Sequence, residues 1–149
     1  MGASVSDRFT GVWALRAIRD RVAGGRETDH PDFGADPCGL LVYTASGHVS
    51  VNFMRRNRKA WAMEDQPSAA ERASAAAGYG AYAGRFTVLE AERIVRHHVE
   101  VALVPNRVGR DLDRRFSFEN GNQRLILRPH LFDLAGRKIE RTLTWERIG

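Results

Sequence analysis

Cysteine and long hydrophobic runs are scarce in this sequence, and each scarcity excludes a class of protein. Cys38 is the only cysteine, which excludes an internal disulfide and argues against a zinc site built from thiolates. The longest apolar runs, such as residues 39–43, are far shorter than the roughly 20 residues of a membrane-spanning helix. Residues 1–11 have no basic segment followed by an apolar stretch, so we expect no secretory signal and a cytoplasmic protein.

Lysine is also scarce, although the chain carries a net charge of +5. Lys59 and Lys138 are its only lysines, and the other basic residues are arginines. Together with the many alanines and glycines, this skew is typical of a GC-rich genome rather than of a phosphate-binding surface. The one dense basic segment, residues 55–59, has no interleaved aromatic residues to stack on bases. We therefore expect a solvated loop there, and neither a nucleic acid nor a membrane as partner.

The remaining composition is that of an ordinary globular domain. Hydrophobic residues make up 43% of the chain and charged residues 28%, which excludes disordered, collagen-like and coiled-coil proteins. A chain of 149 residues corresponds to one domain, and it buries enough surface to fold without a metal or a disulfide. We therefore expect a single domain over residues 1–149.

Alternation of apolar and polar residues predicts a chain of antiparallel strands. Short loops rich in glycine, asparagine or acidic residues, at 45–47, 90–92 and 120–122, are typical of hairpins. The predicted strands are residues 9–20, 39–44, 48–54, 81–89, 93–103, 111–119, 123–128 and 138–148. Eight sequential strands close most naturally into an up-and-down barrel, because closure removes unpaired edges. A barrel of eight strands is wide enough for one small ligand.

Two segments interrupt the alternation. Residues 23–37 are rich in glycine, aspartate and proline, and we predict a long loop there. A helix is predicted over residues 69–77, where Ser68 and Glu71 have the spacing of a capping box and Gly78 ends the helix. The fold class is therefore all-β, an eight-stranded antiparallel barrel with one short helix between its third and fourth strands. We expect this helix to plug one end of the barrel or to lie against its wall.

Period two also predicts which side chains point into the barrel. On the fifth strand His97 shares a face with Val95, Val99, Val101 and Leu103, and the opposite face carries Arg96, His98 and Glu100. On the sixth strand Arg114 shares a face with Leu112, Phe116 and Phe118. We therefore expect Tyr82, His97 and Arg114 to line one internal space.

An inward arginine and an inward histidine need partners, because an unpaired buried polar group is costly. One interpretation is a satisfied polar network within the barrel. The other is a pocket in which Arg114 holds an anion or enolate and His97 moves a proton. For that pocket the catalytic candidates are His97, Arg114 and Tyr82. The ligand-binding candidates are Tyr43, Phe53, Trp61, Phe86, Val99 and Phe116.

Motifs for metals and cofactors are missing from the sequence. His97 and His98 are adjacent on a strand and point to opposite faces, so they cannot bind one ion together. Neither a glycine-rich phosphate loop nor a dinucleotide fingerprint occurs. Cys38 is interpreted as a packed small apolar residue rather than a nucleophile. We expect neither a metal nor another cofactor.

Short matches spread along nearly the whole chain resemble the bacterial and fungal lipocalin-like domain family. They are residues 11–13, 36–37, 39, 41–44, 47–51, 82, 84–86, 97–100, 105–106, 109, 114, 116 and 143–147. The resemblance implies a small barrel in which Trp13 and Arg147 pack together and close the narrow end. An arginine stacked on an indole is a favourable contact.

The resemblance does not imply one reaction, because similar barrels act as cyclases, isomerases or pericyclases in specialised metabolism and others only carry ligands. Three functions stay open. The first is a cofactor-independent enzyme that cyclises or isomerises a small apolar or aromatic metabolite, by folding it in a shaped cavity. The second is a carrier of such a ligand, and the third is a structural or partner-binding barrel with a filled interior. Barrels with exposed outer faces often pair, so a homodimer is also open.

Overall fold

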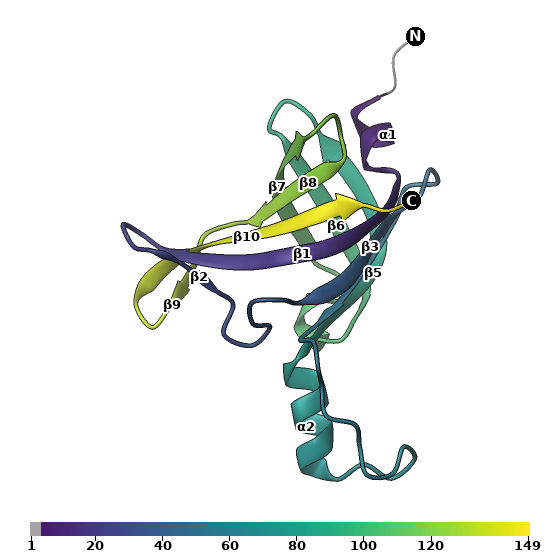
Figure 1. Cartoon of the computed structure of the whole chain (residues 1–149). Helices are drawn as coiled ribbons and strands as arrows, with labels where there is room; N and C mark the ends of the chain where they lie inside the picture. Colours follow the sequence, from purple (N-terminus) through teal and green to yellow (C-terminus); the bar gives the residue numbers. More distant parts are fainter. Residues whose placement is uncertain (1–3) are drawn as a thin grey trace.

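A closed antiparallel barrel makes up most of the molecule (Figure 1). The computed structural model describes residues 4–149, so residues 1–3 of the predicted domain lie outside the described residues. In chain order its elements are α1 (Val5–Phe9), β1 (Gly11–Val22), β2 (Glu27–Asp29), β3 (Cys38–Tyr43), β4 (His48–Met54), α2 (Ala69–Ala77), β5 (Tyr79–Leu89), β6 (Ile94–Ala102), the short 3-10 helix η1 (Pro105–Arg107), β7 (Asp111–Glu119), β8 (Arg124–Pro129), β9 (Phe132–Leu134) and β10 (Arg137–Arg147).

The predicted eight-stranded up-and-down barrel is confirmed. The strand order is β2-β1-β3-β4-β5-β6-β7-β8-β10-β9, and pairing of β1 with β10 closes the sheet. The hairpin at residues 45–47 and the turn at residues 120–122 have the left-handed backbone that their glycine and asparagine residues favour. Alternation located these strands because each has one face in the interior and one in solvent.

Three short elements differ from the prediction. Phe9, expected to start the first strand, instead ends the helix α1, which Ser4 and Asp7 cap. The loop predicted at 23–37 contains β2, which pairs with the second half of β1, and β9 pairs with the start of β10. β2 and β9 are three residues long, too short for an alternating pattern to be recognised.

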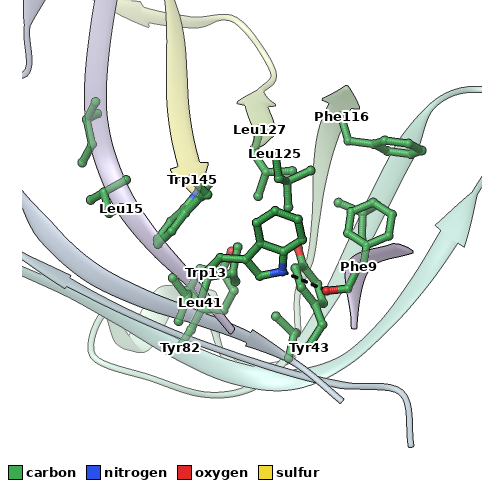
Figure 2. Close-up of a cluster of buried hydrophobic side chains, with 14 of the residues drawn as sticks. Phe9, Trp13, Leu15, Leu41, Tyr43, Tyr82, Phe116, Leu125, Leu127 and Trp145 are labelled. Atoms are coloured by element: carbon green, nitrogen blue, oxygen red, sulfur yellow. Dashed lines mark hydrogen bonds between the residues drawn. The ribbon is translucent and has the colours of Figure 1, made fainter. Parts of the chain in front are cut away.

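The end of the barrel beside α1 (Figure 1) contains tightly packed side chains that close it (Figure 2). Trp13 and Phe9 are fully buried, and the Trp13 indole N–H donates to the Phe9 carbonyl at 2.9 Å. The Arg147 guanidinium lies 4.2 Å from the Trp13 ring centroid and donates to the carbonyls of Thr10 and Arg8. The packing of Trp13 against Arg147 that the resemblance implied is therefore confirmed.

The helix α2 has the predicted bounds and caps, but not the predicted position. Ser68 accepts from the Glu71 amide, the Glu71 side chain accepts from the Ser68 amide, and Gly78 follows the last turn. No residue of α2 is buried among the described residues, and the helix projects from the end of the barrel opposite α1 (Figure 1). The expectation that it plugs the barrel or covers its wall is wrong, because its alanine-rich surface has too little apolar area to pack there. None of the helices in residues 4–149 combines the length and hydropathy of a membrane-spanning helix.

A bulge changes the face of the predicted fifth strand after Val99. Ala83 pairs with Val101 and Gly84 with Val99, so Glu100 is the extra residue. The outcome is that Val101 is 62% exposed and Leu103 42% exposed, whereas both were expected inside. A Cβ atom on Gly84 would collide with the His98 carbonyl oxygen, so glycine is what lets the two strands approach at the bulge.

Candidate functional site

The interior of the barrel contains a cavity of about 690 Å³. Its buried wall includes Leu41, Val51 and Trp145, and its outer lining includes Val104 and Leu131, which are 43% and 52% exposed. The cavity therefore opens to solvent on this side, where the last residues of α2 also reach its edge. Its volume is that of typical small-molecule sites, which span about 300–1,000 Å³.

The period-two assignment places three polar residues correctly. Tyr82, His97 and Arg114 all line this cavity, and they come from β5, β6 and β7. His98 points outward, where it contacts Asp111 at 2.8 Å and Thr87 at 2.8 Å. β6 lies between β5 and β7 in the sheet, where His97 pairs with Phe86 of β5 and with Leu112 of β7. The three polar residues therefore come from adjacent strands.

His97 connects two tyrosines in the interior. Its Nε2 lies 2.7 Å from the Tyr43 hydroxyl and its Nδ1 lies 2.7 Å from the Tyr82 hydroxyl. All three side chains are buried, and His97 is only 1% exposed. Both ring nitrogens therefore have partners within the protein, and a ligand could reach this chain of hydrogen bonds through the Tyr82 hydroxyl.

Each tyrosine hydroxyl has one ring nitrogen of His97 as its only partner among the described residues, so the distances alone fit either direction of donation. Tyr43 lies outside the cavity lining, whereas Tyr82 lines the cavity and can donate to a ligand. With a ligand bound, every group is satisfied when Tyr43 donates to Nε2. His97 then carries its proton on Nδ1 and donates it to the Tyr82 oxygen. This arrangement leaves the Tyr82 O–H free to donate into the cavity, and each bond of the chain polarises the next.

Burial keeps His97 uncharged. Loss of solvent, and next the positive charge of Arg114, lower the pKa of His97 from 6.5 to about 3. Burial also raises the pKa of Tyr43 well above its ordinary value. At neutral pH His97 is therefore a neutral imidazole beside the neutral Tyr43 phenol.

Three arginines of the cavity lining have no acidic partner. Arg107, Arg110 and Arg114 all line the cavity, and none of them forms an ion pair with a carboxylate of the described residues. Burial lowers the pKa of Arg107, and the charge of Arg114 lowers it further. Guanidinium groups are cationic donors without acceptor atoms, so these arginines bring positive charge to the cavity.

The carboxylates around the same cavity are mostly engaged elsewhere. Asp113 binds Arg96 through two bonds of 2.7 and 2.9 Å, and this pairing lowers the pKa of Asp113. Asp20 binds the fourth lining arginine, Arg141, through two bonds of 2.7 and 2.9 Å. Asp32 is an exposed carboxylate at the edge of the cavity. Asp111, which bonds His98, and Arg110 are exposed lining residues as well. The half-buried lining residues Arg107 and Arg114, which have no carboxylate partner among the described residues, therefore give the interior an excess of positive charge.

The other expected ligand-binding residues lie at different depths. Phe53 lines the cavity. Tyr43, Phe86 and Phe116 belong instead to an aromatic cluster around Phe9, below the cavity lining (Figure 2 labels Phe9, Tyr43 and Phe116). Val99 is buried in the same core. Trp61 is 37% exposed in the loop before α2, outside the cavity lining of the described residues.

Three further lining residues escaped the interpretation of the sequence. Arg107 ends η1 and Arg110 follows it before β7, in a segment where alternation no longer predicts direction. Trp145 of β10 was not among the candidate site residues. Its indole N–H is buried and has no acceptor among the described residues. No cluster of three or more histidine, cysteine, aspartate or glutamate side chains suited to a metal ion occurs within residues 4–149.

Comparison with protein families agrees with the barrel geometry. A family model described as a lipocalin-like domain matches residues 10–148. No curated protein matches the sequence. The family match spans every strand of the barrel.

Proposed function

Because the chain belongs to the lipocalin-like domain family, we propose that it binds one small, mostly apolar molecule inside its barrel. The observation that carries the proposal is the open cavity of about 690 Å³. Apolar side chains such as Leu41, Val51 and Leu127 form much of its wall, with a few polar groups among them. Pockets of this composition gain affinity from apolar burial and orientation from the few polar contacts.

The size of the cavity also separates this proposal from a structural barrel. A structural barrel needs its interior filled by side chains, because empty space loses packing contacts. Here the closed end is filled by Trp13, Phe9 and their neighbours, whereas the other half of the interior stays open. That asymmetry supports a binding site rather than a uniform core.

The test is saturable binding of a neutral, apolar fluorescent probe, N-phenyl-1-naphthylamine. Leu112→Trp adds bulk within the cavity lining, and we expect it to weaken probe binding about 10-fold or more, since overfilled sites cost about 1–3 kcal/mol. Leu40→Trp is the matched control, because Leu40 is 49% exposed on the outside. Equal binding by wild type and Leu112→Trp, or no saturable binding, would contradict the proposal.

A second candidate is a cofactor-independent cyclase or isomerase acting on the bound molecule. The observation that favours it is the Tyr43–His97–Tyr82 chain beside Arg114. Hydrogen-bond donors fixed where negative charge develops, such as on an enolate oxygen, stabilise a transition state. The cavity wall would also hold a flexible substrate in a folded conformation.

In this candidate reaction the roles differ from those first expected. His97 has both ring nitrogens occupied and a pKa of about 3, so it would position and polarise Tyr82 rather than accept a proton directly. Tyr82 would donate a hydrogen bond to the substrate oxygen, and Arg114 would stabilise the charge on it.

Turnover of a candidate substrate distinguishes the two functions. If the protein is an enzyme, we expect Arg114→Met and Tyr82→Phe to lower the rate about 10²–10³-fold, the loss typical of a deleted oxyanion donor. Probe binding by the folded variants should persist. Full turnover in both variants would remove these residues from the mechanism. If the wild-type protein turns over none of the small apolar or aromatic candidate substrates, only the binding function is supported.

A further inference from the structure

We propose that the ligand is an amphiphile with an oxyanion head group, a carboxylate or a phosphate monoester, held by Arg107, Arg114 and the Tyr82 hydroxyl. The inference rests on the proposed binding function and adds the chemical class of the ligand. It follows from which hydrogen-bonding groups of the cavity already have partners and which do not.

The groups left over in the cavity are donors. Arg107, Arg110 and Arg114 have no carboxylate partner among the described residues, and the Trp145 indole N–H has no acceptor there. The Tyr82 O–H is available to a ligand as well, in the tautomer in which the His97 Nδ1–H donates to the Tyr82 oxygen. The Trp145 indole N–H is buried, Arg107 and Arg114 are half-buried, and Arg110 is exposed. Donors removed from water without an acceptor are costly, so Arg107, Arg114 and Trp145 favour a ligand that brings acceptor oxygens.

The acceptors near the cavity are already used. Asp113 is bound to Arg96, Asp111 to His98 and Asp20 to Arg141. Asp32 is the exception, and it is an exposed residue at the edge. A cationic ligand would therefore meet an excess of guanidinium groups in the interior, whereas an anion would meet its complement.

The arginines are placed where a charge has most effect. Arg114 lies close enough to His97 and Tyr43 for its charge to disfavour the protonated imidazole, and Arg107 and Arg114 repel each other. An anion between Arg107 and Arg114 would relieve that repulsion. Guanidinium groups bind carboxylate and phosphate through paired hydrogen bonds, and the apolar wall is left for the body of the ligand.

The test compares competitors that share one apolar body. Decanoate, decyl phosphate and 1-decanol are each titrated against bound N-phenyl-1-naphthylamine. We expect at least one of the two anions to displace the probe at a concentration about 10-fold or more below that of 1-decanol, the gain typical of charge-assisted hydrogen bonds. The stronger anion identifies the head group.

Matched variants assign the preference to the arginines. We expect Arg107→Met and Arg114→Met each to weaken anion binding about 10-fold and to leave 1-decanol unchanged. Arg115→Met is the control, because Arg115 is an exposed neighbour on the same strand. Tyr82→Phe should weaken the anions by a smaller factor and leave 1-decanol unchanged.

Two failures can be told apart. If the probe does not bind, the proposed function itself is wrong. If the probe binds but both anions and 1-decanol displace it equally in wild type and variants, the cavity takes an uncharged ligand and the inference is overturned.

Discussion

His97 is a base that its surroundings keep neutral. It is 1% exposed, it lies between two tyrosine hydroxyls at 2.7 Å, and its pKa is about 3. An imidazole in solution would take up a proton near pH 6.5. The folded barrel therefore opposes a protonation that the unfolded chain accepts.

That difference predicts an acid-sensitive fold. As the pH falls from about 6.5 towards 3, the unfolded chain binds a proton at His97 that the native chain does not, so the free energy of unfolding falls by up to about 1.4 kcal/mol per pH unit. The pKa of His30 is also lowered, chiefly by burial, and adds a smaller loss in the same direction. Denaturant unfolding at several pH values between about 4.5 and 7 measures the slope.

His97→Gln should reduce this slope, because glutamine keeps a hydrogen-bonding end without titrating. His48→Gln is the control, since His48 is exposed in a hairpin, and its slope should equal that of wild type. An unchanged slope in His97→Gln would show that His97 is not the residue whose protonation the fold opposes.

At the scale of elements, α2 is held by its ends rather than by packing. None of its described residues is buried, and nine residues are too few for a helix to be stable alone. Its support is the capping box of Ser68 and Glu71, together with the Arg58 guanidinium, which donates to the Ala75 carbonyl at 3.0 Å. The helix is therefore a local unit attached to the barrel.

Ser68→Ala should open α2 without unfolding the barrel. Loss of an N-cap costs about 1 kcal/mol, and we expect that loss in the hydrogen-exchange protection of the helix amides. The free energy of global unfolding should stay within about 0.5 kcal/mol of wild type, as for surface changes. A global loss equal to the local loss would contradict this prediction, because it would show that α2 folds together with the barrel.

The elements also show which features the sequence can reveal. Alternation places His97 and Arg114 inside, because their strands are regular between hairpins. It fails at Val101, since the pattern of apolar residues continues through a bulge that only the pairing of β5 with β6 reveals. Arg107 lies in η1, outside the strands, where strand alternation does not predict the direction of a side chain. The cavity's charge was therefore only partly predictable.

At the scale of the whole molecule, one seam joins the first and last strands of the barrel. Trp13 of β1 pairs with Arg147 of β10, and the Trp13 indole bonds to α1. Closure of the barrel therefore depends on residues separated by nearly the whole chain. Trp13 links β1 to β10 through Arg147 and to α1 through its hydrogen bond to Phe9, which Figure 2 shows.

Trp13→Ala should weaken the whole barrel. Removal of a buried large aromatic side chain costs about 3–5 kcal/mol, and we expect that loss in the free energy of unfolding measured with denaturant. Trp61→Ala is the matched control, because Trp61 is 37% exposed, and it should change stability by less than about 1 kcal/mol. Equal stability of the two variants would show that Trp13 does not hold the seam.

The closed end has a consequence for how the proposed ligand would leave. Trp13, Phe9 and Arg147 block one end of the interior, so entry and exit share the opening near η1 and the end of α2. One ligand must then dissociate before another can enter, because the barrel has no second opening through which the first could leave. With a single opening, the residence time of the proposed ligand is set by its own dissociation rate and does not depend on the concentration of a competitor.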